Sequence, residues 1–214
     1  MSGRPAHRLP GALLAAFAVA ALVELVSVAV DARTGQLLAK PLLMPLLAAY
    51  VAARGGPRLL VAALLLGWGG DVFLLSSADG AFLAGMGCFA AGHLCYLMLF
   101  GRRPTRAGQG LALGYGLALV VALALLWSGL PAELRVPVAV YSLLLAAMAC
   151  RASALGPLAG AGGALFLLSD TLIATGVADR PQPPAADLWI MLTYIAAQAL
   201  LTAGILRSRP RTHD

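Results

Sequence analysis

Residues 58–77 read RLLVAALLLGWGGDVFLLSS, an apolar run with one carboxylate inside it. About 20 helical residues reach across the roughly 30 Å hydrocarbon core of a bilayer. A charge at the bilayer centre costs at least about 2.5 kcal/mol, so Asp71 is a functional candidate by default. This stretch therefore predicts a membrane helix that carries part of a polar site.

Similar apolar runs fill the rest of the chain. Its 214 residues are 61% hydrophobic and 11% charged, with a mean hydropathy of +0.88. A soluble domain has about 25% charged residues, so a single water-soluble core is excluded. We predict an all-α, polytopic membrane helix bundle of about eight transmembrane helices, forming one integral-membrane domain over residues 1–214. The predicted spans are 11–30, 37–53, 58–77, 81–100, 108–128, 134–150, 157–177 and 187–206.

The distribution of charge predicts the topology. If the N-terminus is inside, eleven of the fifteen Lys and Arg residues lie on the cytoplasmic side. This positive-inside asymmetry predicts a cell-membrane protein with both termini in the cytoplasm. It also accounts for the net charge of +6 without nucleic-acid binding. Cys88, Cys95 and Cys150 lie within spans and form no CxxC pair, so we expect packing roles and no metal site.

Charged residues inside the spans fall at one predicted depth. Asp71 and Asp170 each lie thirteen residues beyond the cytoplasmic start of their spans, which is about 20 Å of helix. Glu24 lies at a similar depth, and Lys40 can reach the same layer from the outer side. The two aspartates are four spans apart, so two parallel four-helix halves are a further possibility.

Small residues precede both aspartates. Glycine occupies positions 67, 69 and 70 before Asp71, and positions 160, 162 and 163 before Asp170. Small residues favour close helix packing in membranes. They can also leave a slot for an acyl chain beside the carboxylate, and the sequence keeps both interpretations open.

Several short motifs occur in a defined order along the chain, whereas the GxSxG motif of serine hydrolases and the HExxH motif of zinc proteases are absent. The motifs are Lys40-Pro41-Leu42-Leu43-Met44-Pro45, Gly70-Asp71, Phe89-x-x-x-His93-x-x-Tyr96, Gly163 to Ser169-Asp170, and Tyr194-x-x-x-Gln198. On these motifs the chain resembles the YhhN family of membrane proteins, which includes the lysoplasmalogenases.

The resemblance implies an ether hydrolase that acts on a lysophospholipid entering from the bilayer. It would cleave the vinyl ether bond of a lysoplasmalogen, or of a related ether lysolipid, to a fatty aldehyde and a glycerophospho-alcohol. Such a bond is protonated on carbon and passes through an oxocarbenium ion, so the reaction needs an acid and a nearby anion. Two carboxyl groups in different protonation states supply both. We predict Asp71 and Asp170 as this pair, with their roles unassigned and no cofactor required.

The other polar residues have less specific predicted roles. Lys40 binds a lipid phosphate or neutralises a carboxylate such as Glu24, which is a second-tier candidate. His93 relays protons, positions water or forms a hydrogen bond between helices. Further residues are predicted to line the site or to bond between helices, and these are Tyr96, Ser169, Tyr194 and Gln198.

A proton- or ion-coupled transporter of a small amphiphile is the alternative function. Intramembrane acids, lysines and histidines are also the parts of proton relays. Such a transporter is expected to have broken helices at its site. Pro41 and Pro45 can break the second span and residues 67–70 can interrupt the third, so the sequence keeps this alternative open.

Overall fold

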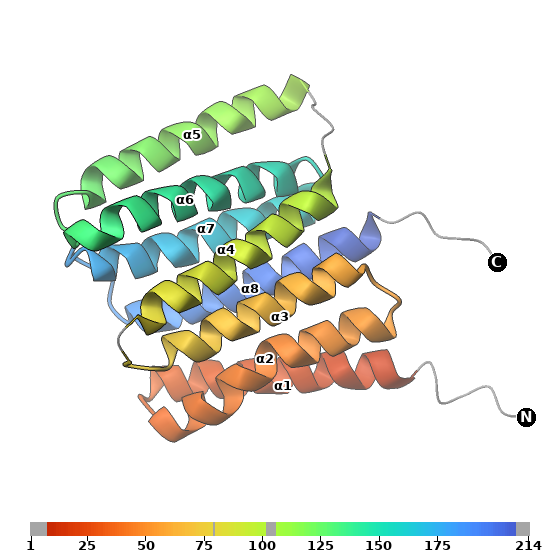
Figure 1. Cartoon of the computed structure of the whole chain (residues 1–214). Coiled ribbons are helices and arrows are strands. Elements are labelled where there is room, and N and C mark those ends of the chain that lie inside the picture. The colour runs from red at the N-terminus through yellow and green to blue at the C-terminus, as the bar shows by residue number, and fades with distance from the viewer. Residues whose placement is uncertain (1–7, 79, 102–105, 209–214) are drawn as a thin grey trace, which may run out of the picture. The chain divides into compact units, whose positions relative to one another are not determined.

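The structure is a computed structural model that describes residues 8–78, 80–101 and 106–208, with the backbone alone at 106–108. Its described part contains eight α-helices and no strand (Figure 1). The helices are α1 (Arg8–Ala29), α2 (Arg33–Ala53), α3 (Arg58–Leu74), α4 (Ala81–Phe100), α5 (Arg106–Leu126), α6 (Ala132–Ser153), α7 (Pro157–Val177) and α8 (Ala186–Arg207). The prediction of an all-α helix bundle is confirmed.

The helices have the length and composition of membrane spans. Within the described residues, seven of them are long and apolar enough to cross a bilayer. The exception is α3, whose 17 residues extend about 25 Å. The chain is a multi-pass membrane protein. Its orientation in the membrane stays a prediction. Some of the arginines on which this prediction rests, including Arg102 and Arg103, lie outside the described residues.

Four helix boundaries differ from the predicted ones by three or four residues. α1 begins at Arg8 rather than at residue 11, and α6 ends at Ser153 rather than at residue 150. α3 ends at Leu74 rather than at residue 77. There, the Ser76 hydroxyl accepts a hydrogen bond from the backbone N–H of Ala78 at 3.2 Å, and such local bonds compete with continuation of a helix. α2 begins at Arg33 rather than at residue 37. Its first turn is helical although its residues are polar, so a search for apolar runs does not include it.

The two helices that were expected to be broken if the chain were a transporter are both continuous. Pro41 and Pro45 lie inside α2, and α3 runs through residues 67–70. A proline has no N–H to donate to the carbonyl four residues earlier, so the regular bonds to the Leu37 and Pro41 carbonyls are missing. The helix nevertheless extends to Ala53. These observations favour the enzyme over the transporter.

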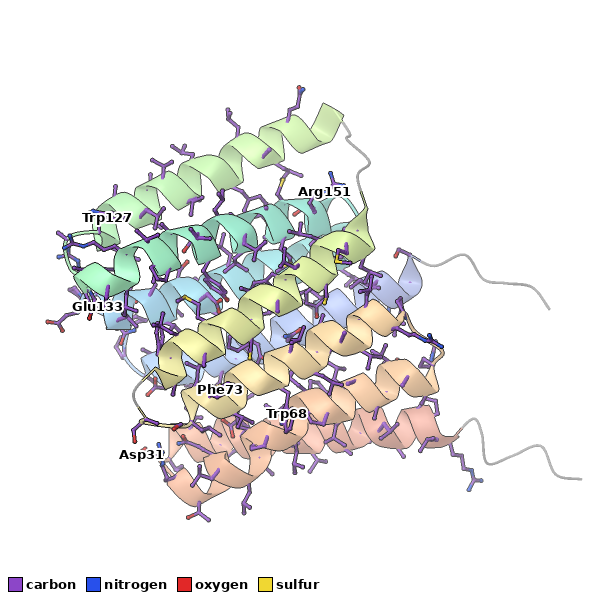
Figure 2. The ribbon with its side chains drawn as sticks, viewed as in Figure 1. Asp31, Trp68, Phe73, Trp127, Glu133 and Arg151 are labelled. Atoms are coloured by element: carbon purple, nitrogen blue, oxygen red, sulfur yellow. The ribbon has the colours of Figure 1, made fainter. Side chains whose placement is uncertain are left out.

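The chain divides into two compact units, the first ending at Leu99 and the second beginning at Phe100. The first unit contains α1 to α4, with α1 packed on α2 and α2 on α3. The α1–α2 turn and the end of α3 lie at one end of this unit, where the Arg33 side chain donates a 3.4 Å hydrogen bond to the Leu75 carbonyl. Figure 2 shows Asp31 and Phe73 at this shared end.

Glycine allows α3 and α4 to approach closely. A Cβ atom at Gly70 would lie 2.5 Å from the Phe89 ring, and a Cβ atom at Gly92 would lie 3.2 Å from the Ala63 carbonyl oxygen. The ring of Phe89 therefore occupies the space that a side chain at position 70 would need. This contact holds the helix of His93 against the helix of Asp71.

The second unit contains α5 to α8, and its helices pack in chain order. At the α7–α8 contact, a Cβ atom at Gly162 would lie 2.8 Å from the Leu201 backbone nitrogen. At the α6–α7 contact, a Cβ atom at Gly163 would lie 2.8 Å from the Cα of Ala149. Protein atoms thus fill the space beside Gly70, Gly162 and Gly163, which favours packing over an acyl-chain slot.

The ends of α6 show how the second unit is oriented along its helices. Figure 2 shows Trp127, which follows α5, at the same end as Glu133 in the first turn of α6. Arg151 lies in the last turn of α6, at the opposite end of that helix. Neighbouring helices of the unit therefore run antiparallel, and the end of α7 and the start of α8 belong to the same end as Glu133.

Candidate active site

Three predicted residues of the first unit lie at a similar depth from its shared end. Glu24 is five residues before the end of α1, Lys40 is seven residues after the start of α2, and Asp71 is three residues before the end of α3. These positions are about 5 to 10 Å along the helix axes from that end. His93 is twelve residues into α4, about 18 Å from the same end. The two acids and the lysine thus form a layer, and the histidine lies deeper.

Glu24 and Lys40 are neighbours across the α1–α2 contact. The ammonium charge and the backbone N–H of Lys40 both act on the Glu24 carboxylate. Glu24 is 1% exposed, and its Oε2 atom has no hydrogen-bond partner among the described residues. Lys40 is only partly buried. The structure thus places Lys40 beside Glu24, and both predicted roles of Lys40 stay predictions.

Asp71 lies on the buried face of α3. This face repeats every three or four residues and includes Leu64 and Gly67, so the same stripe that packs the helix also carries the carboxylate. Asp71 is 3% exposed, and both His93 and Tyr96 of α4 are 1% exposed. All three are thus interior residues of the bundle.

In the second unit, Asp170 is held by a residue that we did not predict. The hydroxyl of Tyr141 on α6 donates a hydrogen bond to Oδ2 of Asp170 on α7. Both side chains are partly buried. Tyr194 on α8 interacts electrostatically with Tyr141, so three helices contribute polar groups to this cluster.

The residues around this cluster fix α7 against α8. The rings of Phe166 and Tyr194 meet edge to face, with centroids 5.5 Å apart and an interplanar angle of 87°. The Ser169 hydroxyl donates a 3.1 Å hydrogen bond to the Ile190 carbonyl, which is a bond between helices. Gln198 is buried one turn beyond Tyr194 on α8. The structure thus brings Ser169, Asp170 and Tyr194 together.

Sequence reasoning missed Tyr141 because this residue is neutral and lies outside the motifs that resemble the YhhN family. A depth comparison could have found it. Tyr141 is nine residues after the start of α6, and Asp170 is seven residues before the end of α7. Antiparallel neighbours place these positions at about 14 and 11 Å from the same end.

The last helices of the two units carry similar pairs. Phe89 and His93 lie eight and twelve residues after the start of α4. Tyr194 and Gln198 lie eight and twelve residues after the start of α8. This agrees with the predicted division into two four-helix halves. The pairing of Asp71 with Asp170 stays a prediction, because each carboxylate lies in a different unit.

The described residues include no group of three or more His, Cys, Asp or Glu side chains that could hold a metal ion. Cys88, Cys95 and Cys150 are free thiols at partly buried positions. The chemistry that this part of the chain offers is that of carboxyl, phenol, imidazole and ammonium groups.

Comparison with known proteins identifies relatives over most of the chain. It is 42% identical to the lysoplasmalogenase TMEM86B of Homo sapiens over 154 residues, which are 72% of this chain and 66% of that protein. It is 38% identical to the lysoplasmalogenase TMEM86B of Rattus norvegicus over 171 residues, 79% of this chain and 71% of that protein. It is 34% identical to a lysoplasmalogenase of Mycobacterium tuberculosis over 163 residues, 71% of this chain and 62% of that protein.

The aligned part of this chain thus covers just under two thirds of the length of the human relative. No solved structure matches the chain. The model of the YhhN family matches residues 35–205, which include every predicted site residue except Glu24. Because that match extends from α2 to the end of α8, the chain belongs to the YhhN family.

Proposed function

We propose that this chain is a lysoplasmalogenase-like hydrolase of the cell membrane. It cleaves the vinyl ether bond of a lysoplasmalogen, or of a related ether lysolipid, and releases a fatty aldehyde and a glycerophospho-alcohol. The observation that carries the proposal is the similarity to relatives named lysoplasmalogenase, at 34–42% identity over most of the chain. The intramembrane carboxylates support it, because the reaction requires groups of that type.

The reaction balances with water as the only co-substrate. A carboxylic acid transfers its proton to the alkene carbon farther from the ether oxygen, and the alkene electron pair forms the new C–H bond. The resulting oxocarbenium ion is stabilised by a nearby carboxylate. Water adds to the carbon next to oxygen and returns a proton to the first carboxylate. The hemiacetal then breaks its C–O bond to the glycerol oxygen, which takes up the hydroxyl proton, to give the aldehyde and the alcohol.

Asp71 and Asp170 are the residues that we assign to these two carboxyl groups. A carboxyl pair in different states is the arrangement used for glycosides, which also react through an oxocarbenium ion. Each aspartate belongs to the packed interior of its unit, at a partly or fully buried position. Burial of this kind excludes bulk water, which strengthens the interaction of a carboxylate with a developing cation.

The polar residues around the aspartates receive supporting roles in this proposal. Lys40 binds the phosphate of the lysolipid as a charged hydrogen-bond donor. His93 positions the attacking water or relays its proton. Further residues shape the two carboxylate environments, and these are Tyr96, Ser169, Tyr194 and Gln198. The lysolipid enters from the bilayer, since its hydrocarbon chain is already dissolved there.

The test is release of aldehyde by the purified chain from a vinyl ether lysolipid and from its saturated alkyl ether analogue. The saturated compound has no alkene carbon to protonate, so only the vinyl ether should react. Asp71→Asn and Asp170→Asn should each reduce kcat by at least about 100-fold, the usual contribution of an acid or base. Equal aldehyde release from wild type and both variants would contradict the proposal.

Two further aspartates serve as matched controls. Asp31 and Asp179 are exposed and have a φ of 51°, a left-handed conformation that asparagine also accepts. Asp31→Asn in the first unit and Asp179→Asn in the second should therefore fold and react like wild type. A loss of activity in these controls would mean that any Asp→Asn change harms the chain.

A further inference from the structure

A stripe of buried polar side chains runs along α8. Tyr194, Gln198 and Thr202 follow one another at intervals of four residues, and each is at most 4% exposed. Residues four apart on a helix lie on the same face, and their side chains tilt toward the helix N-terminus. The stripe therefore extends about 12 Å along α8, with Thr202 directed toward Gln198 and Gln198 toward Tyr194.

The stripe connects the depth of Asp170 with the far end of α8. Asp170 is seven residues before the end of α7 and Tyr194 is eight residues after the start of α8, so both lie about 11 to 12 Å from their shared end. Tyr194 also interacts electrostatically with Tyr141, the hydrogen-bond donor to Asp170. Thr202 is five residues before the end of α8, about 8 Å from the opposite end. Polar groups thus lead from near that end to the candidate carboxylate.

Thr202 differs from other helical hydroxyl residues of its unit. Ser153, Thr171 and Thr193 each donate a hydrogen bond to the carbonyl four residues earlier, at 3.0, 2.7 and 2.7 Å. Thr202 is 2% exposed, and its Oγ1 atom has no hydrogen-bond partner among the described residues. Buried polar groups that no protein group satisfies are typically satisfied by a bound water.

The surroundings of Thr202 supply the partners that a bound water needs, which are about three in number. The Gln198 side chain lies one turn earlier on the same face and carries both donors and an acceptor. The backbone carbonyl of Gln198 has a second lone pair beyond the one used in the helix. The backbone of α7 does not compete for this position. It packs at Gly204, where a Cβ atom would lie 2.7 Å from the Ala159 nitrogen, about 200° around α8 from Thr202.

We propose that Thr202 and Gln198 bind a water molecule and that the polar stripe of α8 supplies water to Asp170. Water is the co-substrate of the proposed function, and one molecule is consumed for each vinyl ether bond broken. Hydroxyl and amide groups along the stripe replace the hydrogen bonds that water loses in apolar surroundings. The supply role rests on the proposed function, whereas the bound water is a property of the chain without substrate.

X-ray hydroxyl-radical labelling of the full chain in detergent tests the water site without substrate. Radicals formed from a bound water oxidise the side chains next to it, even where bulk water has no access. Ile205 reports on the site, because it lies three residues after Thr202 on the same helix face and is 2% exposed. We expect Ile205 to be oxidised in wild type. Met148 is 0% exposed on α6 and should stay unlabelled, although its sulfur is more easily oxidised.

Two threonines of α8 provide a matched pair of variants. Thr202→Val keeps the shape of the side chain and removes the hydroxyl. It should reduce the oxidation of Ile205 several-fold and lower kcat by about 2- to 10-fold, the value of one neutral hydrogen bond, with KM unchanged. Thr193→Val removes a hydroxyl that donates within α8 and should change neither quantity. Thr202→Ser keeps the hydroxyl and should behave like wild type.

The outcomes separate the two proposals. An unlabelled Ile205 in wild type would overturn the inference, and this result does not require that any variant fold. Equal oxidation of Met148 would mean that radicals enter the core in general, and would overturn it as well. So would the same labelling or the same kcat in Thr202→Val and wild type. If the expected labelling occurs but no lipid releases aldehyde, the water site stands and the proposed function fails.

Discussion

The carboxylate of Glu24 on α1 lies beside Lys40 on α2, where the ammonium charge and the backbone N–H of that lysine both act on it. Glu24 precedes the region matched by the family model, residues 35–205. The first helix thus contributes a charged partner to a lysine that lies in one of the motifs shared with the family. The free-energy cost of placing the Lys40 charge inside the bundle therefore depends on Glu24, a residue outside those motifs.

The first prediction from this pair concerns stability. Lys40→Met removes the positive charge and leaves a carboxylate that is 1% exposed without its counter-charge. Leaving a buried acceptor without its charged neighbour costs about 1–3 kcal/mol, and Lys40 itself is partly exposed. The double variant Glu24→Gln/Lys40→Met removes both charges, so its loss should be smaller than the sum of the single losses. Denaturant unfolding in detergent measures wild type, Glu24→Gln, Lys40→Met and the double variant, and additive losses would mean that the two residues are not coupled.

The second prediction concerns the lipid phosphate. The double variant Glu24→Gln/Lys40→Met has no unpaired charge, so its kinetics report the role of Lys40 without the stability loss of the single variant. We expect kcat/KM for a phosphate-bearing vinyl ether lysolipid to fall by about 10- to 100-fold, the value of a charge-assisted hydrogen bond. The same vinyl ether on glycerol without phosphate should be unaffected.

A second cation controls for general loss of positive charge. Arg58 is exposed at the start of α3, at the end of its unit opposite Lys40 and Asp71. Arg58→Met should therefore not change kcat/KM for either lipid. An equal fall for the lipid with phosphate and the lipid without it would argue that Lys40 does not bind the head group.

The helices could be predicted from sequence because the bilayer leaves few alternatives. Only helices and closed barrels satisfy the backbone in lipid, so each apolar run had to be a helix. The errors in the helix boundaries arose where the helical residues and the apolar residues do not coincide. Residues 33–36 are polar yet helical at the start of α2, and α3 stops at Leu74 because Ser76 bonds locally to Ala78.

The site was predictable where it is charged or where it lies in a motif of the YhhN resemblance. Asp71 and Lys40 stand out in apolar spans because burying a charge is expensive. The structure buries Asp71 and places the charge of Lys40 where it acts on Glu24. Tyr141 did not stand out, because it is neutral and lies outside those motifs. Its importance comes from a contact between α6 and α7, and a contact between distant residues is not written in the local pattern.

The last prediction tests how glycine positions the helix of Asp71. A Cβ atom at Gly70 would lie 2.5–2.8 Å from three atoms of the Phe89 ring, so Gly70→Ala must displace that ring. Overpacking of this kind costs about 1–3 kcal/mol. We expect a fall of that size in the free energy of unfolding, together with reduced activity, because Asp71 is the next residue along α3.

The matched control and the rescue use the facing helix. Gly87 on α4 has no atom within 4 Å of where its Cβ would lie. Gly87→Ala should therefore leave stability unchanged or raise it, since alanine is favoured over glycine in a helix by about 1 kcal/mol. The obstacle at Gly70 is a side chain rather than backbone, so Phe89→Leu should recover part of the stability lost in Gly70→Ala. If Phe89→Leu destabilises the Gly70→Ala variant as much as it destabilises wild type, the ring of Phe89 is not what position 70 accommodates.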